Sequence, residues 1–229
     1  EMLSLSAAPL PQFDVAAGDG LLGVSRTDSP LISSLFLHVH LLGKAIKEKK
    51  KVLFVSRQLA ETNLRIICTK LAIRWDPNLI RVLEMGEALG MELGDENGAC
   101  ERLAETIERA AAGCAYVLIE DVSTFDFLGA EPFVLLDLLD RLEANPELAR
   151  CLVSFSHECP LYRLLLHRAD YDVVLEPVGA GFGKDVTGTM LLRNRTGGGL
   201  LPTSTRLLFH VGDRSMKCFP PGAVSSIYF

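Results

Sequence analysis

Residues 21–36, LLGVSRTDSPLISSLF, form the part of the chain whose residue types and spacing come nearest to a phosphate-binding loop. An apolar run, a turn and the start of a helical pattern follow one another, as they do around the phosphate loop G-x-x-x-x-G-K-[ST]. That loop works because its glycines let backbone N–H groups surround the phosphates, its lysine neutralises them and its hydroxyl binds magnesium.

The residues present here remove each of those roles. With Gly23 as the first glycine, the second falls on Asp28, the lysine on Ser29 and the magnesium ligand on Pro30. A carboxylate about 4 Å from a phosphate charge costs about 4 kcal/mol at an effective dielectric constant near 20, where a lysine would gain that amount. Ser29 followed by Pro30 suits the N-cap and first turn of a helix, so helix capping is favoured over phosphate binding.

Two further positions bear on nucleotide hydrolysis. Many NTPases place a water-activating glutamate after the second strand, whereas here the run VLFVS is followed by Arg57, and the next carboxylate is Glu61. The later run AYVLIED ends in Asp121, where an acid would hold magnesium through water. A solvated or loop-capping role for Asp121 is favoured over metal or nucleotide contact. We expect no catalytic residue, and the vestigial positions of a nucleotide site are Asp28, Ser29, Pro30 and Asp121.

The elements that position these residues alternate between short apolar runs and helical periodicities. This alternation predicts βαβ units and an α/β fold with a mostly parallel sheet covered on both faces. The predicted strands are Gly20–Ser25, Lys51–Ser56, Leu79–Glu84, Ala115–Asp121 and Cys151–Phe155. Helical spacing of apolar residues between them predicts four sheet-packing helices, which begin near Leu31, Leu64, Leu103 and Leu135.

The pattern changes after residue 170. The runs YDVVLEPV, TGTMLLRN, TRLLFHV and SMKCF leave no room for ordinary helices, so they predict antiparallel strands that complete the sheet. Gly212 and Asp213 are the predicted two-residue turn of the last hairpin. We expect one domain over residues 1–229, with a βαβ core at 15–155 and the antiparallel strands at 171–222.

Composition narrows the class of protein. The 229 residues are 48% hydrophobic, and no apolar run approaches the roughly 18 residues needed to cross a bilayer. Without a recognisable secretion signal, we expect a soluble cytoplasmic protein, with the nucleus left open as a second location. Six scattered cysteines predict reduced core thiols, not disulfides or zinc ligands. The net charge of −6 means that any nucleic acid contact must come from a local patch.

The candidate nucleic-acid contacts lie in glycine-rich loops and after the fifth strand. Lys184 stands in GAGFGKDVTG, and Arg193 and Arg195 lead into RTGGG, where glycines would let the loop follow an RNA backbone. His157, with Glu158, follows the fifth strand in SFSHECP and is a candidate for a pore-facing loop. The alternatives are turn geometry and solubility for the cations, which we weigh more heavily.

Two segments are candidate interfaces with other proteins. The first is STFDFLGAEPF, which spans residues 123–133 and carries three phenylalanines around a glycine. The second is the N-terminal segment LSAAPLPQFDV, residues 5–15. Local packing is the favoured alternative for both, because scattered phenylalanines on loops also close cores.

The order of these features resembles the RecA-like accessory subunits of the Elongator complex. The resemblance covers roughly residues 15–222 and rests on three segments more than on a signature motif. These segments are DGLLGVSRTDSPLISSLFLHVHLLGKAIKEKKKVLFVS, AYVLIEDVSTFDFLG and RLLFHVGDRSMKCFPPG.

The resemblance implies a RecA-like three-layer fold and a ring to which ATP hydrolysis is attributed. The losses in the phosphate loop of this chain count against a contribution of its own, so we expect a subunit without catalysis or cofactor. The resemblance also implies that the ring is a hetero-hexamer formed with two paralogous RecA-like subunits. That ring docks on the catalytic Elongator subunits and binds tRNA in support of wobble-uridine modification. Three alternatives stay open: a RecA-like ATPase related to recombinase paralogues or clock proteins, a composite ATP site between subunits, and identity with either of the other two accessory subunits.

Overall fold

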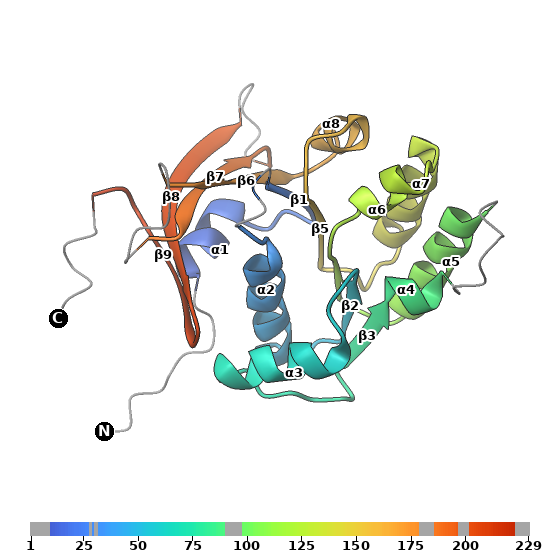
Figure 1. The fold of residues 1–229 in the computed structure, drawn as a ribbon, viewed down its shortest axis with the longest axis horizontal. Coiled ribbons are helices and arrows are strands. Elements are labelled where there is room, and N and C mark those ends of the chain that lie inside the picture. Colours follow the sequence, from blue (N-terminus) through green and yellow to red (C-terminus); the bar gives the residue numbers. More distant parts are fainter. Residues whose placement is uncertain are drawn as a thin grey trace.

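The computed structural model describes residues 10–27, 29, 32–89, 98–178, 186–196 and 202–222. Within these residues the chain forms nine strands in one sheet and eight helices (Figure 1). The strands are β1 (Leu22–Thr27), β2 (Val52–Ser56), β3 (Ile80–Glu84), β4 (Tyr116–Ile119), β5 (Arg150–Phe155), β6 (Tyr171–Pro177), β7 (Gly188–Asn194), β8 (Thr203–Gly212) and β9 (Ser215–Phe219). The helices are α1 (Pro11–Ala17), α2 (Leu35–Lys47), α3 (Glu61–Lys70), α4 (Met85–Ala88), α5 (Ala99–Ala111), α6 (Ser123–Phe127), α7 (Pro132–Glu143) and α8 (Pro160–Leu166).

The sheet has the order β3-β2-β4-β5-β1-β6-β7-β8-β9. The first six strands in this order are parallel, and their central members are buried on both faces. Val, Ile and Leu fill these strands because both faces are covered, so apolar residues run without interruption. The five strands predicted from apolar runs are all present, with ends that differ by one or two residues.

The C-terminal strands differ from the prediction in two details. The segment Tyr171–Pro177 lies parallel to β1 and antiparallel to β7, so β6 is where the sheet changes direction. The strands β7, β8 and β9 are antiparallel, as predicted. In the last hairpin Gly212 pairs with Ser215, so Asp213 and Arg214 form the two-residue turn in place of Gly212 and Asp213.

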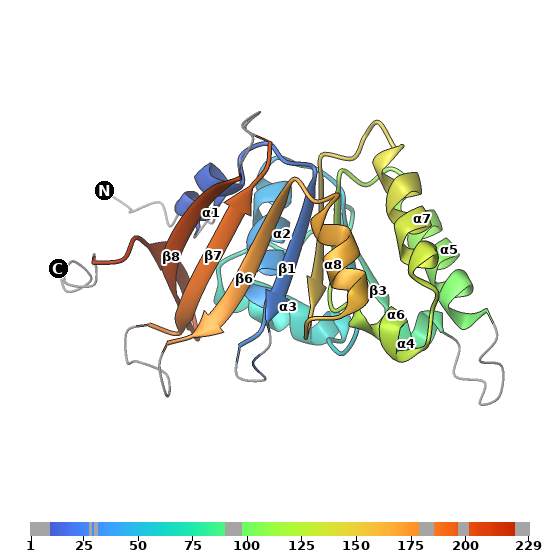
Figure 2. The same ribbon diagram turned by 90° about the horizontal axis from the view of Figure 1, so that it is seen from above.

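Helices cover both faces of the sheet, so the structure has three layers, with the sheet between two groups of helices (Figure 2). The sheet separates the hydrophobic core into two apolar layers. One layer lies between the sheet and α1, α2 and α3, and contains Phe54, Tyr116 and Phe209. The other lies between the sheet and α4 to α8, and contains Leu53, Val117 and Phe155. Alternate residues of one strand enter opposite layers, as the two-residue period of a strand requires. No helix of the described residues is long and apolar enough to cross a bilayer.

The helix α1 belongs to a segment proposed above as a surface. Leu10 and Phe13 are fully buried against the sheet, and the side-chain amide of Asn194 donates to the carbonyl oxygens of Ala16 and Ala17 at 3.0 and 3.1 Å. In its described part, this segment therefore packs locally, although Val15 is exposed. All six cysteines are free and buried, which agrees with the core role predicted for them.

Candidate functional site

The parallel strands β1, β2, β4 and β5 end at one edge of the sheet, and a polar hollow of about 460 Å³ lies there. Open α/β sheets bind ligands at this edge, so it is the candidate site. Within the described residues, its polar lining includes Thr27, Ser34, Arg57, Glu120, Asp121 and Ser156.

The phosphate-loop alignment that starts at Gly23 is wrong in register. The strand β1 continues to Thr27, so Gly23 lies inside the sheet, where an added Cβ would overlap the ring of Tyr171. A loop between β1 and α2 would occupy residues 27–35, TDSPLISSL, and this stretch contains neither glycine nor lysine. The chemical conclusion therefore holds in the corrected register, because the groups that surround and neutralise phosphate are missing.

The predicted helix start is also wrong. The helix α2 begins at Leu35 and not beside Ser29, and the hydroxyl of Ser33 accepts the Leu35 amide at 3.1 Å. Ser29 stays close to the end of β1, where its amide donates to Thr27 Oγ1 at 3.3 Å. Asp28 and Pro30 lie outside the described residues. The N-cap residue of α2 is Ser34, whose side chain makes no capping hydrogen bond.

Asp121 is bound by protein groups on several sides. Its carboxylate forms an ion pair with Arg57, and its second oxygen accepts the Ser156 amide at 3.3 Å. Its own amide donates to Ser154 Oγ at 2.9 Å, and its φ of 53° places it in the left-handed region, where aspartate is among the tolerated residues. Asp121 thus acts as the loop-capping carboxylate that the sequence favoured.

The neighbouring groups form a second set of contacts at the same edge. The hydroxyl of Ser56 donates a hydrogen bond to the carboxylate of Glu120 at 2.9 Å. The same hydroxyl oxygen accepts a hydrogen bond from the Leu59 amide at 2.7 Å. The guanidinium of Arg57 lies over the ring of Phe127, 5.5 Å from its centroid. Arg57, the residue directly after β2, is therefore held between the carboxylate of Asp121 and the ring of Phe127.

Sequence reasoning missed His38, a fully buried residue of α2. Its Nε2 lies 3.2 Å from the carbonyl oxygen of Ile119, and its Nδ1 lies 3.1 Å from that of Ser34. Burial lowers the pKa of His38, although both carbonyls and Glu120 favour the charged ring. A neutral ring donates to only one of the two carbonyls. Two histidines at a spacing of two gave no sign that one would join α2 to the end of β4.

Two of the predicted RNA contacts, Arg193 and Arg195, form ion pairs with the buried Asp172. Asp172 of β6 lies opposite Arg193 of β7, and its Oδ2 is 2.7 Å from Arg193 Nη2 while its Oδ1 is 2.6 Å from Arg195 Nη1. Asp172 is fully buried, whereas the side chains of Arg193 and Arg195 are 33% and 29% exposed. Lys184 lies outside the described residues. A polar residue within a buried strand, Asp172 in YDVVLEPV, was the available signal for this cluster.

His157 lies apart from those arginines, in the loop after β5. Its Nε2 is 3.8 Å from Asp126 Oδ2, and its ring stands against Phe127 with centroids 5.2 Å apart. Glu158 forms ion pairs with Arg26 and Arg163, of which the second spans 2.8 Å. Of the three described contacts, His157 therefore lies in the loop after β5, whereas Arg193 and Arg195 lie on β7 and directly after it.

The phenylalanine-rich segment is divided between core and surface. Phe125 is fully buried, whereas Phe127, Leu128 and Phe133 are exposed around the end of α6 and the start of α7. We call these three exposed residues the α6–α7 patch.

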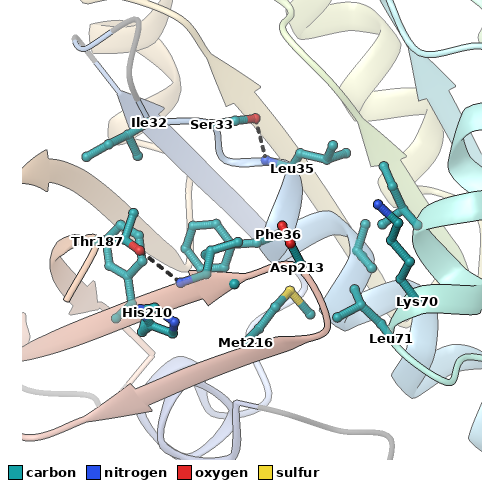
Figure 3. Close-up of a pocket in the computed structure, with 15 residues that line it drawn as sticks. Ile32, Ser33, Leu35, Phe36, Lys70, Leu71, Thr187, His210, Asp213 and Met216 are labelled. Atoms are coloured by element: carbon teal, nitrogen blue, oxygen red, sulfur yellow. Dashed lines mark hydrogen bonds between the residues drawn. The ribbon is translucent and has the colours of Figure 1, made fainter. Parts of the chain in front are cut away.

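A second hollow, of about 570 Å³, lies between α2, α3 and the β8–β9 hairpin (Figure 3). Its lining is largely apolar and includes Phe36, Leu71 and Met216, while Ile32 and Ser33 also line the polar hollow. Nothing in the sequence singled out this hollow, because its residues come from four separate segments.

The chain matches no protein-family model and no curated protein. Among solved structures it is similar to the crystal structure of a KaiC-like protein from the hyperthermophilic archaeon Pyrococcus horikoshii. The two share 15% sequence identity over 93% of this chain and 97% of that chain, with a TM-score of 0.64. This likeness confirms the predicted RecA-like α/β fold, with its mostly parallel sheet and antiparallel C-terminal strands.

Proposed function

We propose that the chain is a non-catalytic subunit of a hetero-hexameric RecA-like ring that supports tRNA binding and wobble-uridine modification. Among the three RecA-like accessory subunits, we propose Elongator complex protein 6, because the three segments that carry the resemblance occur here in its order. The observation that carries the non-catalytic part is the Arg57–Asp121 ion pair, because Arg57 is the single cation in the described lining of the polar hollow.

Charge in the hollow supports this proposal. The charged residues among its described lining are Arg57, Glu120 and Asp121, which together carry a net charge of −1. A nucleoside triphosphate placed there would face two carboxylates, and the one guanidinium already binds Asp121. Electrostatic stabilisation of a transferring phosphoryl group needs cations that are free to reach it. We therefore propose that this subunit has no hydrolytic activity of its own.

The distribution of exposed apolar side chains supports membership of a ring. A head-to-tail ring requires two different faces on each subunit, because the contacts are heterologous. The α6–α7 patch lies on one side of the molecule, and Val15 of α1 and Val211 of β8 are exposed on the side of α1 and the β8–β9 hairpin (Figure 1). We propose that two paralogous RecA-like subunits contact these faces and that the assembled ring docks on the catalytic Elongator subunits.

The tRNA contact is proposed to come from partly exposed cations. Two guanidinium groups share the single carboxylate of Asp172, so the cluster keeps a net charge of +1 with about a third of each arginine side chain exposed. Arginine binds phosphate well through its planar fork. We keep Arg193, Arg195, Lys184 and His157 as the proposed contacts, supplied jointly with neighbouring subunits.

The first test is native mass spectrometry of this chain co-expressed with the two other RecA-like Elongator accessory subunits. We expect a hexamer with two copies of each chain. The double variant Phe127→Asp, Phe133→Asp should lower the hexamer fraction, because a charge in an apolar interface is costly. Ile66→Asp, on the exposed side of α3, is the matched control and should leave the hexamer unchanged. A monomer or homo-oligomer that ignores both partners would overturn the proposal.

A thermal-stability assay tests the rival ATPase function on the isolated chain. A ligand at 100 times its Kd stabilises the folded state by about 2.7 kcal/mol. We expect magnesium-ATP to leave the melting temperature unchanged, because the hollow lacks phosphate-binding groups. A stabilisation that grows with the logarithm of the ATP concentration above Kd would favour the ATPase.

A further inference from the structure

Three side chains with different metal-binding atoms gather beside the polar hollow. Asp126 belongs to α6, which follows β4, and His157 and Cys159 belong to the loop between β5 and α8. One ligand atom from each residue lies within 4.8 Å of the other two. The strands β4 and β5 are neighbours in the sheet, so the fold brings α6, which follows β4, next to the loop that follows β5.

The spacing within this cluster fits a shared ion better than a direct contact. His157 Nε2 and Asp126 Oδ2 are 3.8 Å apart, which is too long for a hydrogen bond. Two such atoms bound to one tetrahedral zinc, each at about 2.0–2.2 Å, are separated by about 3.4 Å. A movement of a few tenths of an ångström would therefore bring both atoms to the distance that a common ion requires.

The surroundings orient His157 for this role. Its Nδ1 lies 3.3 Å from Ser156 Oγ. When Nδ1–H donates a hydrogen bond to this hydroxyl, the lone pair of Nε2 is on the side of Asp126. A hydrogen bond at the second ring nitrogen is the usual support of a metal-bound histidine. The ring of Phe127 lies against the imidazole, which restricts its rotation.

We propose that Asp126, His157 and Cys159 form a binding site for a divalent cation of the zinc class. Imidazole nitrogen and thiolate sulfur select borderline-soft metals, whereas magnesium and calcium require oxygen ligands. Asp126 is exposed and Cys159 is buried, so the site opens to solvent on the side of Asp126. The fourth tetrahedral position is left for water or for a ligand from a bound partner.

The metal-site proposal does not require the ring function, although His157 is also a proposed tRNA contact and its ring packs against Phe127 of the α6–α7 patch. It departs from the sequence analysis, which expected the six cysteines to be core thiols and expected no metal ligands. That expectation rested on the absence of paired cysteine spacings, whereas the fold supplies Asp126 from a different loop. Hydrolysis and RNA contact play no part in the proposal, so either can fail without affecting the metal site.

The test is a titration of the metal-free full chain with Co²⁺, followed by absorption spectroscopy. We expect one equivalent to bind with a thiolate-to-cobalt charge-transfer band and the d–d bands of tetrahedral cobalt, and Zn²⁺ to displace it. The variant Cys159→Ser should abolish the charge-transfer band. The matched control is Cys100→Ser, because Cys100 and Cys159 are both 5% exposed and Cys100 lies on α5, away from this cluster.

Asp126→Asn and His157→Gln complete the test, because they replace half-exposed or exposed side chains and should leave the fold intact. Each removes one ligand, and we expect Co²⁺ to bind at least about tenfold more weakly, since even supporting residues of metal sites are worth that factor. The proposal is overturned if the wild-type chain shows no thiolate band, or if the band survives in Cys159→Ser.

Discussion

Two arginine–aspartate clusters in this protein have the same chemistry and different surroundings. Asp172 lies near the start of β6, fully buried, and is bound by Arg193 of the neighbouring strand and by Arg195 directly after it. Asp121 lies at the end of β4, beside the polar hollow, and is bound by Arg57. The first cluster is part of the sheet, and the second is on the edge where this fold binds ligands.

The comparison shows that the sequence position of an arginine does not reveal its role until the carboxylate that it contacts is known. Arg193 and Arg195 appeared available for RNA because they lead into a glycine-rich loop, but a buried carboxylate holds both. In the sequence, Arg57 was noted only because it follows the second strand in place of a glutamate. Its ion pair with Asp121 supports the proposal of a site without hydrolysis. A buried charge must be paired, so the sheet cluster has the stronger structural role.

The largest expected effect comes from the double variant Arg193→Ala, Arg195→Ala. It leaves the carboxylate of Asp172 inside the sheet without a cation, which typically costs about 3–5 kcal/mol. We expect a loss of that order in the free energy of unfolding, measured by urea denaturation at neutral pH. Arg206→Ala, an exposed position on β8, is the control and should change stability by less than about 0.5 kcal/mol.

A small loss in the double variant would show that the two clusters differ less than their burial implies. The result also determines how RNA binding should be tested. If the alanine variant is strongly destabilised, weaker tRNA binding by it carries no information about contact. Arg195→Lys keeps the charge next to Asp172 but lacks the planar fork, so it tests phosphate contact in a folded protein.

The next effect separates a packing glycine from a phosphate-loop glycine. In Gly23→Ala the new methyl group would overlap the buried ring of Tyr171, and overpacking of this kind costs about 1–3 kcal/mol. We expect that loss in thermal or urea unfolding. Gly86→Ala on α4 is the control, because nothing lies within 4 Å of its added Cβ, and it should be neutral or stabilising. Equal effects of the two substitutions would contradict the packing role.

The same comparison explains how far the sequence could be read. Strands such as Val52–Ser56 were predicted because a strand buried on both faces must be continuously apolar. The start of α2 was not, because residues 27–35 carry capping signals at Ser29, before the helix begins at Leu35. The direction of β6 was missed because pairing with β1 depends on a partner about 150 residues away, which no local pattern reports.

For the candidate site, the sequence predicted which phosphate-loop residues are missing, but not which side chains contact one another. Missing lysine and glycine residues were visible in the sequence, so the absence of phosphate-binding groups followed directly. The Arg57–Asp121 pair joins residues 64 positions apart, and the contact of His38 with Ile119 spans 81 positions. Such contacts depend on strand order, which alternation of strands and helices does not determine.

A third prediction concerns pH at the edge of the sheet. Burial lowers the pKa of His38 below its ordinary value of 6.5, so the unfolded chain binds a proton that the folded chain does not. Stability should therefore be complete above about pH 6.5 and fall as the pH decreases toward the folded pKa, by at most about 1.4 kcal/mol per pH unit. Urea unfolding at several pH values measures this slope.

The variant His38→Leu isolates the contribution of this residue. It keeps an apolar side chain in the core but removes the titrating group, so stability should depend less on pH below 6.5 than in the wild type. An unchanged slope in His38→Leu would mean that other groups cause the acid sensitivity.

The smallest expected effect is that of Arg57→Ala, and it tests the functional side of the comparison. The side chains of Arg57 and Asp121 are 33% and 13% exposed, so the pair should contribute about 1 kcal/mol or less, which urea unfolding can measure against Arg65→Ala on α3. If Arg57 only blocks a working site, its removal should create a stabilisation by magnesium-ATP. We expect none, because freeing Asp121 restores one magnesium ligand but leaves residues 27–35 without the glycines and lysine that hold phosphate. Stabilisation by ATP in this variant alone would show that the arginine had replaced a nucleotide function that the rest of the loop still retains.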